Sequence, residues 1–296
     1  MNIPFKKLIP FAFVLLWSTG FIGAKYGLPY AGTGDFLSLR GVGNIAVFLL
    51  LIFALKQPRL TIKQIFHSMV TGLLIHGAYL GGVFGAIEQG ISAGVTAIVV
   101  GLQPLLTAFI AMYLFKESLN KKQWLALGIG VLGIALVVLN QVGLSKVSSS
   151  ALMCTIIALF GITLGTLYQK RFCQNQPLLP SMLWQYIASL AVFLIISFSQ
   201  SAPEVNWNNE FIFALLWLII ALSVISILLL LYMIEHGAAS KVSSYFYLVP
   251  PATAIEAWLL FDETLSIISL FGMALCVCSV YVLTNKVAKS KSKSKK

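Results

Sequence analysis

Charged residues are scarce in this chain. They make up 10% of its 296 residues, and only nine are Asp or Glu, whereas a soluble domain carries about 25% charged residues. Hydrophobic residues make up 59%, and the mean hydropathy is +0.93. This balance excludes a soluble globular protein. Because a membrane-spanning helix needs about 20 apolar residues, the chain has room for roughly ten of them and for no extramembrane domain.

Cysteine is also too rare for a disulfide or metal framework. The four cysteines form no C-x-x-C pair, and Cys154, Cys276 and Cys278 fall inside apolar runs, so we expect them to be small buried hydrophobic residues. The sequence has no H-E-x-x-H motif, no phosphate-binding loop and no paired catalytic aspartates. These absences argue against an enzyme, and the sequence predicts no cofactor and no metal.

Long apolar runs bounded by charge, Gly or Pro predict an all-α fold with ten membrane-spanning helices. The predicted spans cover residues 8–24, 36–55, 65–87, 91–115, 124–142, 151–168, 181–199, 211–234, 242–261 and 265–283.

The positive charges predict the orientation of these spans. With both termini in the cytoplasm, only Lys25 and Lys146 of the 20 Lys and Arg residues fall in outer loops, and Arg40 falls inside the second span. The positive-inside rule favours that arrangement. Residues 286–296 alternate Lys with Ser, which predicts a disordered cytoplasmic tail attracted to lipid headgroups. Nucleic-acid binding has no motif to support it.

The two halves of the chain repeat each other. Residues 87–90 (Ile-Glu-Gln-Gly) match residues 234–237 (Ile-Glu-His-Gly), and Pro104 and Pro251 have the same offset. This predicts five-helix repeats over 1–143 and 151–285. Because five is odd, the second repeat would enter the membrane inverted. Inverted repeats are typical of secondary transporters, in which the substrate lies near the bilayer midplane.

The sequence resembles the EamA-type branch of the drug/metabolite transporter superfamily. The resemblance rests on residues 17–21 (Trp-Ser-Thr-Gly-Phe), on residues 101–105 (Gly-Leu-Gln-Pro-Leu) running to Glu117, and on residues 248–251 (Leu-Val-Pro-Pro) running to Glu263. Lys116 and Asp262 replace the Gly that usually precedes the closing acidic residue. The resemblance implies export of small metabolites, amino acids or their derivatives among them, across a bacterial inner membrane.

Few ionisable residues lie inside predicted spans, where a charge costs about 2.5–3.5 kcal/mol or more, and Arg40 and Glu256 are the clearest cases. Arg40 and Glu256 both fall about 6–8 Å below the outer boundary. We expect them either to pair and gate the outer side, or to separate and bind the carboxylate and ammonium of a zwitterionic substrate. A permanent salt bridge, or an Arg40 side chain that extends to the interface, are the alternatives.

Other polar and aromatic residues at mid-depth complete the predicted substrate site. Helix kinks are expected at the prolines of the fourth and ninth spans, where freed carbonyls would line a cavity. The candidates for the site and the kinks are His76, Tyr79, Gln103, Asn44, Gln185, Trp17 and Tyr245, together with Pro104, Pro250 and Pro251.

The sequence thus predicts an alternating-access exporter whose partners are its small-molecule substrate and membrane lipids. A homodimer is left open. Proton coupling is also left open, with His76 and Glu256 as the groups suited to it. A passive channel and a nonenzymatic receptor or scaffold remain the alternatives, although a scaffold has no need of proline-kinked helices with interior charge.

Overall fold

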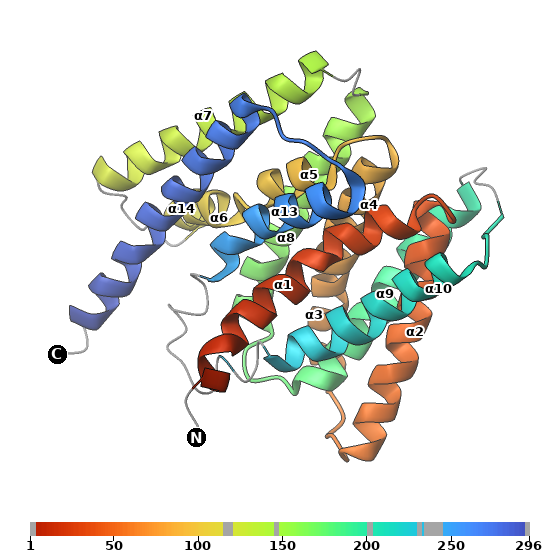
Figure 1. Cartoon of the computed structure of the whole chain (residues 1–296). Helices are drawn as coiled ribbons and strands as arrows, with labels where there is room; N and C mark the ends of the chain where they lie inside the picture. Colours follow the sequence, from red (N-terminus) through yellow and green to blue (C-terminus); the bar gives the residue numbers. More distant parts are fainter. Residues whose placement is uncertain are drawn as a thin grey trace. The chain divides into compact units, whose positions relative to one another are not determined.

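The computed structural model describes residues 4–114, 121–144, 148–199, 204–229, 233 and 245–293. Within these residues the regular structure is helical (Figure 1). Six helices are long and apolar enough to cross a membrane, and four shorter apolar helices accompany them. Each of the ten predicted spans has its counterpart among these helices, which confirms an all-α polytopic membrane protein.

The helices follow one another along the chain in this order. The first half holds α1 (Pro4–Gly27), α2 (Thr33–Ala54), α3 (Ile62–Gly72), the π-helix η1 (Leu73–Leu80), α4 (Gly81–Glu88), α5 (Ala93–Val100), α6 (Gln103–Leu114) and α7 (Lys121–Leu144). The second half holds α8 (Ser149–Phe172), α9 (Leu178–Ser199), α10 (Asn209–Trp217), the π-helix η2 (Leu218–Ser226), the 3-10 helix η3 (Phe246–Leu248), α13 (Val249–Phe261) and α14 (Ile267–Lys293).

Polar residues mark where several helices begin and end. The hydroxyls of Ser92 and Ser148 and the side chain of Asn208 each accept a backbone amide at a helix start. At the end of α13, Asp262 takes the left-handed conformation with φ 54°. Gly favours this conformation, and Asp tolerates it better than most residues. The replacement of the usual Gly by Asp262 therefore leaves the turn before Glu263 intact.

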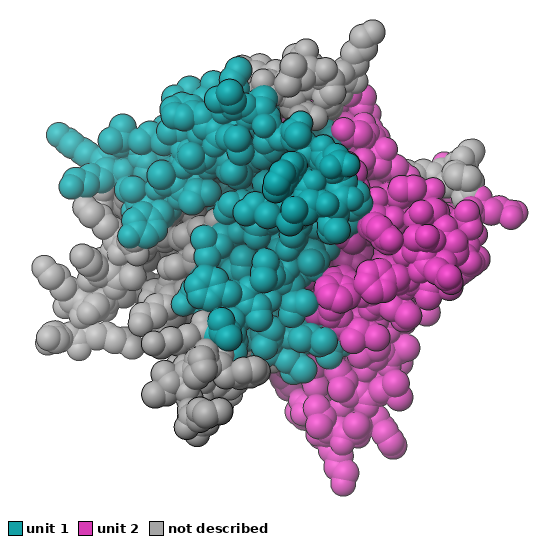
Figure 2. Space-filling view, viewed as in Figure 1, with its two compact units in different colours: residues 1–22, 91–147, 224–296 teal, residues 23–90, 148–223 magenta. Residues whose placement is uncertain are grey.

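The described residues form two compact units (Figure 2). Unit 1 comprises residues 1–22, 91–147 and 224–296, and unit 2 comprises residues 23–90 and 148–223. Each unit therefore takes helices from both sequence halves. In unit 2, α2 packs against α9; in unit 1, α5 packs against α13 and α7 against α14. These pairs join the second, fourth and fifth spans of one repeat to their counterparts in the other, as a two-repeat architecture requires.

Contacts between loops agree with the predicted alternation of sides. The Asn206 amide donates to the Tyr30 carbonyl at 2.8 Å, which joins two loops predicted to lie outside. The Ser148 hydroxyl donates to Gln89, again between two predicted outer loops. Ser68 donates to Gln176 at 3.0 Å on the side predicted to face the cytoplasm. These contacts show which loops share a side within unit 2, and the placement of both termini in the cytoplasm stays a prediction.

Two details of α14 differ from the sequence-based expectation. The helix continues to Lys293, through most of the segment predicted to be disordered. Residues 284–293 hold no Gly or Pro to end it, so the helix extends from its apolar part. Cys276 is buried as expected, but Cys278 is exposed, because residues two apart face different sides of a helix.

A close helix contact in unit 2 gives a stability prediction. A Cβ atom on Gly34 of α2 would meet the backbone of Ser197 on α9, and backbone cannot move aside as a flexible side chain can. We expect Gly34→Ala to destabilise the protein by about 1–3 kcal/mol, as overpacking does. Thermal unfolding in detergent should show a lower midpoint by several degrees. Gly128→Ala is the control, because a Cβ there meets nothing within 4 Å. Equal midpoints for the two variants would contradict the prediction.

Candidate functional site

A buried arginine lies at the centre of the polar residues of unit 2. Arg40 on α2 is only 4% exposed. Its Nη2 donates to the Ser223 hydroxyl at 3.5 Å, the upper limit for a hydrogen bond. Its Nε and Nη1 atoms are buried and have no hydrogen-bond partner in the described part of the chain. A guanidinium carries five N–H donors in a rigid fork, and most of these donors remain for a ligand.

Aromatic rings line one side of this arginine. The His76 ring stacks on Tyr186, with 4.3 Å between ring centroids and 22° between planes. The guanidinium of Arg40 lies within electrostatic range of His76, Tyr79 and Tyr186. The Tyr186 hydroxyl donates to Ser223 at 3.3 Å. Arg40 and Tyr186 therefore share one acceptor.

Two further side chains near this arginine have buried polar atoms that lack a hydrogen-bond partner among the described residues. Asn44 follows Arg40 by one turn of α2 and is fully buried. Neither its Oδ1 nor its Nδ2 forms a hydrogen bond with the described residues, and the same holds for Nε2 of His76. Buried polar groups in proteins are nearly always hydrogen-bonded. Unit 2 thus holds donors and acceptors that a polar ligand or water can satisfy.

Gln185 belongs to a chain of hydrogen bonds on α9. Its Nε2 donates to Ser181 at 3.2 Å, Ser181 bonds Ser68 at 2.9 Å, and Ser68 donates to Gln176. The chain links Arg40's neighbourhood to the α8–α9 loop through residues on α3 and α9. Gln185 therefore has a hydrogen-bond partner, Ser181, within the protein, and it precedes Tyr186 in the sequence.

Both π-helices of the described chain contribute to this cluster. His76 and Tyr79 lie in η1, and Ser223 lies in η2. The Ser223 hydroxyl also donates to the carbonyl of Leu218, five residues earlier, which fits the wider turn of a π-helix. Such segments are rare and occur frequently at functional sites. They hold polar groups at positions that a regular α-helix would direct elsewhere.

Three predicted site residues of unit 1, namely Glu256, Trp17 and Tyr245, have side-chain contacts within that unit. The Ser18 hydroxyl donates to Oε1 of Glu256 at 2.6 Å. The other carboxyl oxygen of Glu256 and the Thr253 hydroxyl are buried and have no partner among the described residues. Trp17 packs against Phe246 in an edge contact, with 5.3 Å between centroids. Tyr245 lies 6.4 Å from Phe11 in a similar contact.

The fourth and ninth spans are interrupted where the prolines stand. Gln103 and Pro104 open α6, and Gly101 and Leu102 separate it from α5. Pro250 and Pro251 lie in the first turn of α13, directly after η3. A Cβ on Gly101 would contact the Pro250 ring. The two interruptions therefore meet in unit 1.

Arg40 lies in unit 2 and Glu256 in unit 1, and each has a hydrogen-bond partner within its own unit. A contact between the two residues stays a prediction. Sequence reasoning missed three residues that contact the predicted ones: Tyr186 stacks on His76, Ser223 accepts from Arg40, and Ser18 donates to Glu256. Tyr186 adjoins the polar stripe of α9 in sequence and could have been found. Ser223 is one serine in an apolar run and gave no signal. Among the described residues, no cluster of three His, Cys, Asp or Glu could hold a metal ion.

These features define a multi-pass membrane protein with buried, incompletely paired polar groups inside its helical units. The sequence matches the EamA-like transporter family over residues 8–139 and 149–285. The chain therefore belongs to that family, in two copies of its repeat, and is a transporter rather than an enzyme.

Similar proteins agree with this assignment. A protein of Salmonella typhimurium named a probable amino-acid metabolite efflux pump is 22% identical over 91% of both chains. The uncharacterized inner membrane transporter YedA of Escherichia coli is 24% identical over 95% of this chain and 92% of its own. A solved crystal structure matches with a TM-score of 0.64 and 18% identity, over 94% of this chain and 96% of that one, which supports the fold alone.

Proposed function

We propose that this protein is a secondary transporter that exports small organic metabolites, with amino acids or their derivatives as the substrate class, by alternating access. The observation that carries the proposal is the buried Arg40 guanidinium, whose Nε and Nη1 have no hydrogen-bond partner among the residues that the structure describes. A guanidinium fork suits a carboxylate, which it can bind through two parallel hydrogen bonds. The Salmonella relative is named for efflux of the same class of compound.

The remaining groups fit recognition of the rest of such a substrate. Asn44 offers both a donor and an acceptor, and the rings of His76 and Tyr186 offer aromatic surface beside the guanidinium. A site of this kind places a few convergent polar groups among apolar side chains, as small-molecule sites do. Trp17 and Tyr245 stay proposed lining residues for an apolar substrate side chain.

Location and coupling belong to the same proposal. The distribution of Lys and Arg supports placing both termini in the cytoplasm, and the inner membrane transporter YedA among the relatives supports a bacterial inner membrane. Glu256 is the proposed proton carrier, because one of its carboxyl oxygens is buried and unpartnered. A homodimer remains open.

Counterflow into proteoliposomes across a panel of labelled amino acids tests the substrate class. We expect uptake of at least one amino acid and at least about tenfold less uptake of its carboxamide, which cannot form the charged pair with Arg40. Protein-free liposomes give the background. Transport of a cationic drug or a nucleotide-linked sugar, with no response to amino acids, would overturn the proposed class.

A further inference from the structure

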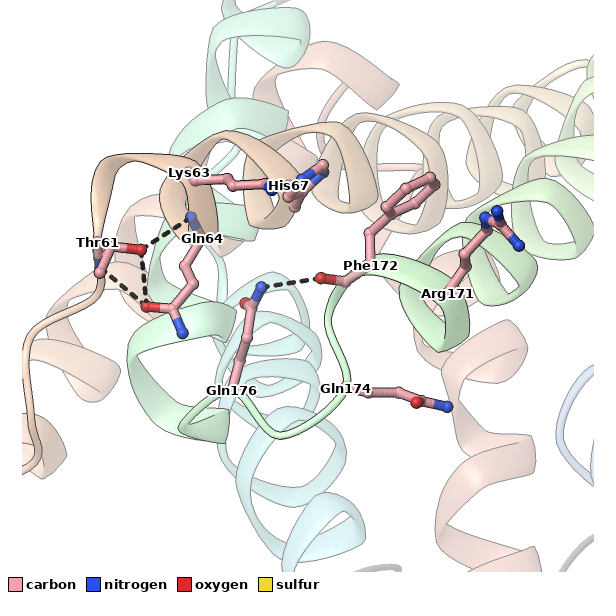
Figure 3. Close-up of a pocket in the computed structure, with 8 residues that line it drawn as sticks. All are labelled: Thr61, Lys63, Gln64, His67, Arg171, Phe172, Gln174 and Gln176. Carbon is pink, nitrogen blue, oxygen red and sulfur yellow. Dashed lines mark hydrogen bonds between the residues drawn. The ribbon is translucent and has the colours of Figure 1, made fainter.

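A second polar pocket opens in unit 2, between the start of α3 and the end of α8. Its volume is about 350 Å³. Figure 3 shows α3 on one side and the α8–α9 turn on the other. The lining residues are Thr61, Lys63, Gln64, His67, Arg171, Phe172, Gln174 and Gln176. This lining carries two permanent cations and no carboxylate, which favours an anionic ligand.

Aromatic side chains contact His67 and Arg171. Lys63 and His67 are four residues apart and so lie on one face of α3. The His67 ring stacks on Phe172, with 4.9 Å between centroids and 8° between planes, and its Nδ1 is bonded to the Tyr168 hydroxyl at 2.8 Å. The Arg171 guanidinium lies 5.6 Å from the Phe172 ring centroid. Phe172 therefore contacts basic groups from both helices.

The polar wall of the pocket is fixed by its own hydrogen bonds. Gln64 and Thr61 form a capping box, in which the Thr61 amide donates to Gln64 Oε1 at 2.9 Å. Gln176 accepts from Ser68 and donates to the Phe172 carbonyl at 3.3 Å. Figure 3 shows Gln64 beside Thr61 at the start of α3, and Gln176 on the turn that follows α8. The polar side chains on this side of the pocket are therefore held in position before a ligand binds.

We propose that this pocket binds a phosphate group, carried either by an anionic phospholipid headgroup or by a soluble phosphate compound. Arg and Lys together supply a fork of donors and a point charge, the combination that phosphate oxygens accept. Ile62 and Phe66 on α3 are 87% and 60% exposed, so apolar surface adjoins Lys63 on the same helix. Basic pockets between membrane helices are suited to acidic headgroups. The inference does not depend on the substrate class proposed above.

Thermal shifts of the full-length protein in neutral detergent distinguish the two sources. The probes are dioctanoyl phosphatidylglycerol, dioctanoyl phosphatidylcholine and inorganic phosphate, each titrated separately. We expect phosphatidylglycerol to raise the unfolding midpoint by several degrees. A shift with phosphatidylglycerol alone assigns the site to an anionic lipid headgroup. A shift with inorganic phosphate as well assigns it to phosphate from either source.

The variant Lys63→Gln/Arg171→Gln tests the location of the site. We expect its apparent dissociation constant for phosphatidylglycerol to be about tenfold larger or more, since two basic contacts are lost. Lys56→Gln/Arg59→Gln removes the same charge from exposed positions outside the lining and should bind as the unaltered protein does. The single variant Arg171→Gln should give a smaller loss. Equal affinities in the pocket and control variants, equal shifts with phosphatidylcholine, or no shift with any probe would overturn the proposal.

Discussion

Replacing Arg40 with Gln is expected to weaken substrate binding by roughly 30-fold or more. Truncating one member of a buried, hydrogen-bonded charge pair costs about 2–5 kcal/mol. In this variant a substrate carboxylate would lose both the positive charge and the paired N–H donors of Arg40, whose Nε and Nη1 have no partner among the described residues. Arg40→Lys keeps the charge but not the fork, so it should bind with an intermediate affinity. Substrate titrations of counterflow and of thermal stabilisation measure the effect.

The same variants separate a binding role from a structural one. Arg40 has one long hydrogen bond within unit 2, and a buried charge with so little pairing costs stability. Arg40→Gln should therefore unfold at the same temperature as the unaltered protein or at a higher one. Arg59→Gln, at an exposed loop position, should leave binding and stability unchanged. Normal binding by Arg40→Gln, or a large loss of stability without a loss of affinity, would contradict the assignment.

Hydropathy predicted the ten spans because long apolar runs are the strongest signal a membrane protein carries. The proline positions predicted where the fourth and ninth spans are interrupted, since Pro104 removes a helix hydrogen bond whatever surrounds it. The grouping of helices into two units was not predictable from these signals. It depends on side-chain packing between distant segments, such as the approach of Gly34 to the backbone of Ser197.

The candidate site was predictable only in part. Arg40, His76 and Asn44 stood out because polar residues are rare within apolar runs. Ser223 became visible only once η2 placed it beside Arg40 and Tyr186. The π-helices themselves have no sequence signature in the runs that form them. His67 lies inside the third predicted span and Arg171 just beyond the sixth, so neither signalled a pocket, and the packing of α3 against α8 brought them together.

Replacing Glu256 with Gln is expected to abolish the response of transport to a pH gradient while leaving exchange of labelled substrate measurable. A proton carrier within a membrane must alternate between a charged and a neutral form, and its neighbours must tolerate both. Glu256 has one oxygen held by Ser18 at 2.6 Å and a second, buried oxygen without a partner. Gln keeps the size and the acceptor for Ser18, but it cannot release a proton. Exchange needs no net proton movement, so it should survive.

The measurement compares net uptake under an imposed pH gradient with counterflow at equal pH in the same proteoliposomes. Glu210→Gln is the matched control, because Glu210 is exposed in the first turn of α10 and should keep both activities. Ser18→Ala should shift the pH at which net uptake is half-maximal, since it removes the hydrogen bond that favours the charged carboxylate. A gradient response that persists in Glu256→Gln would place the coupled proton elsewhere, with His76 as the next residue to replace. Loss of exchange together with the gradient response would instead assign Glu256 to the binding of substrate.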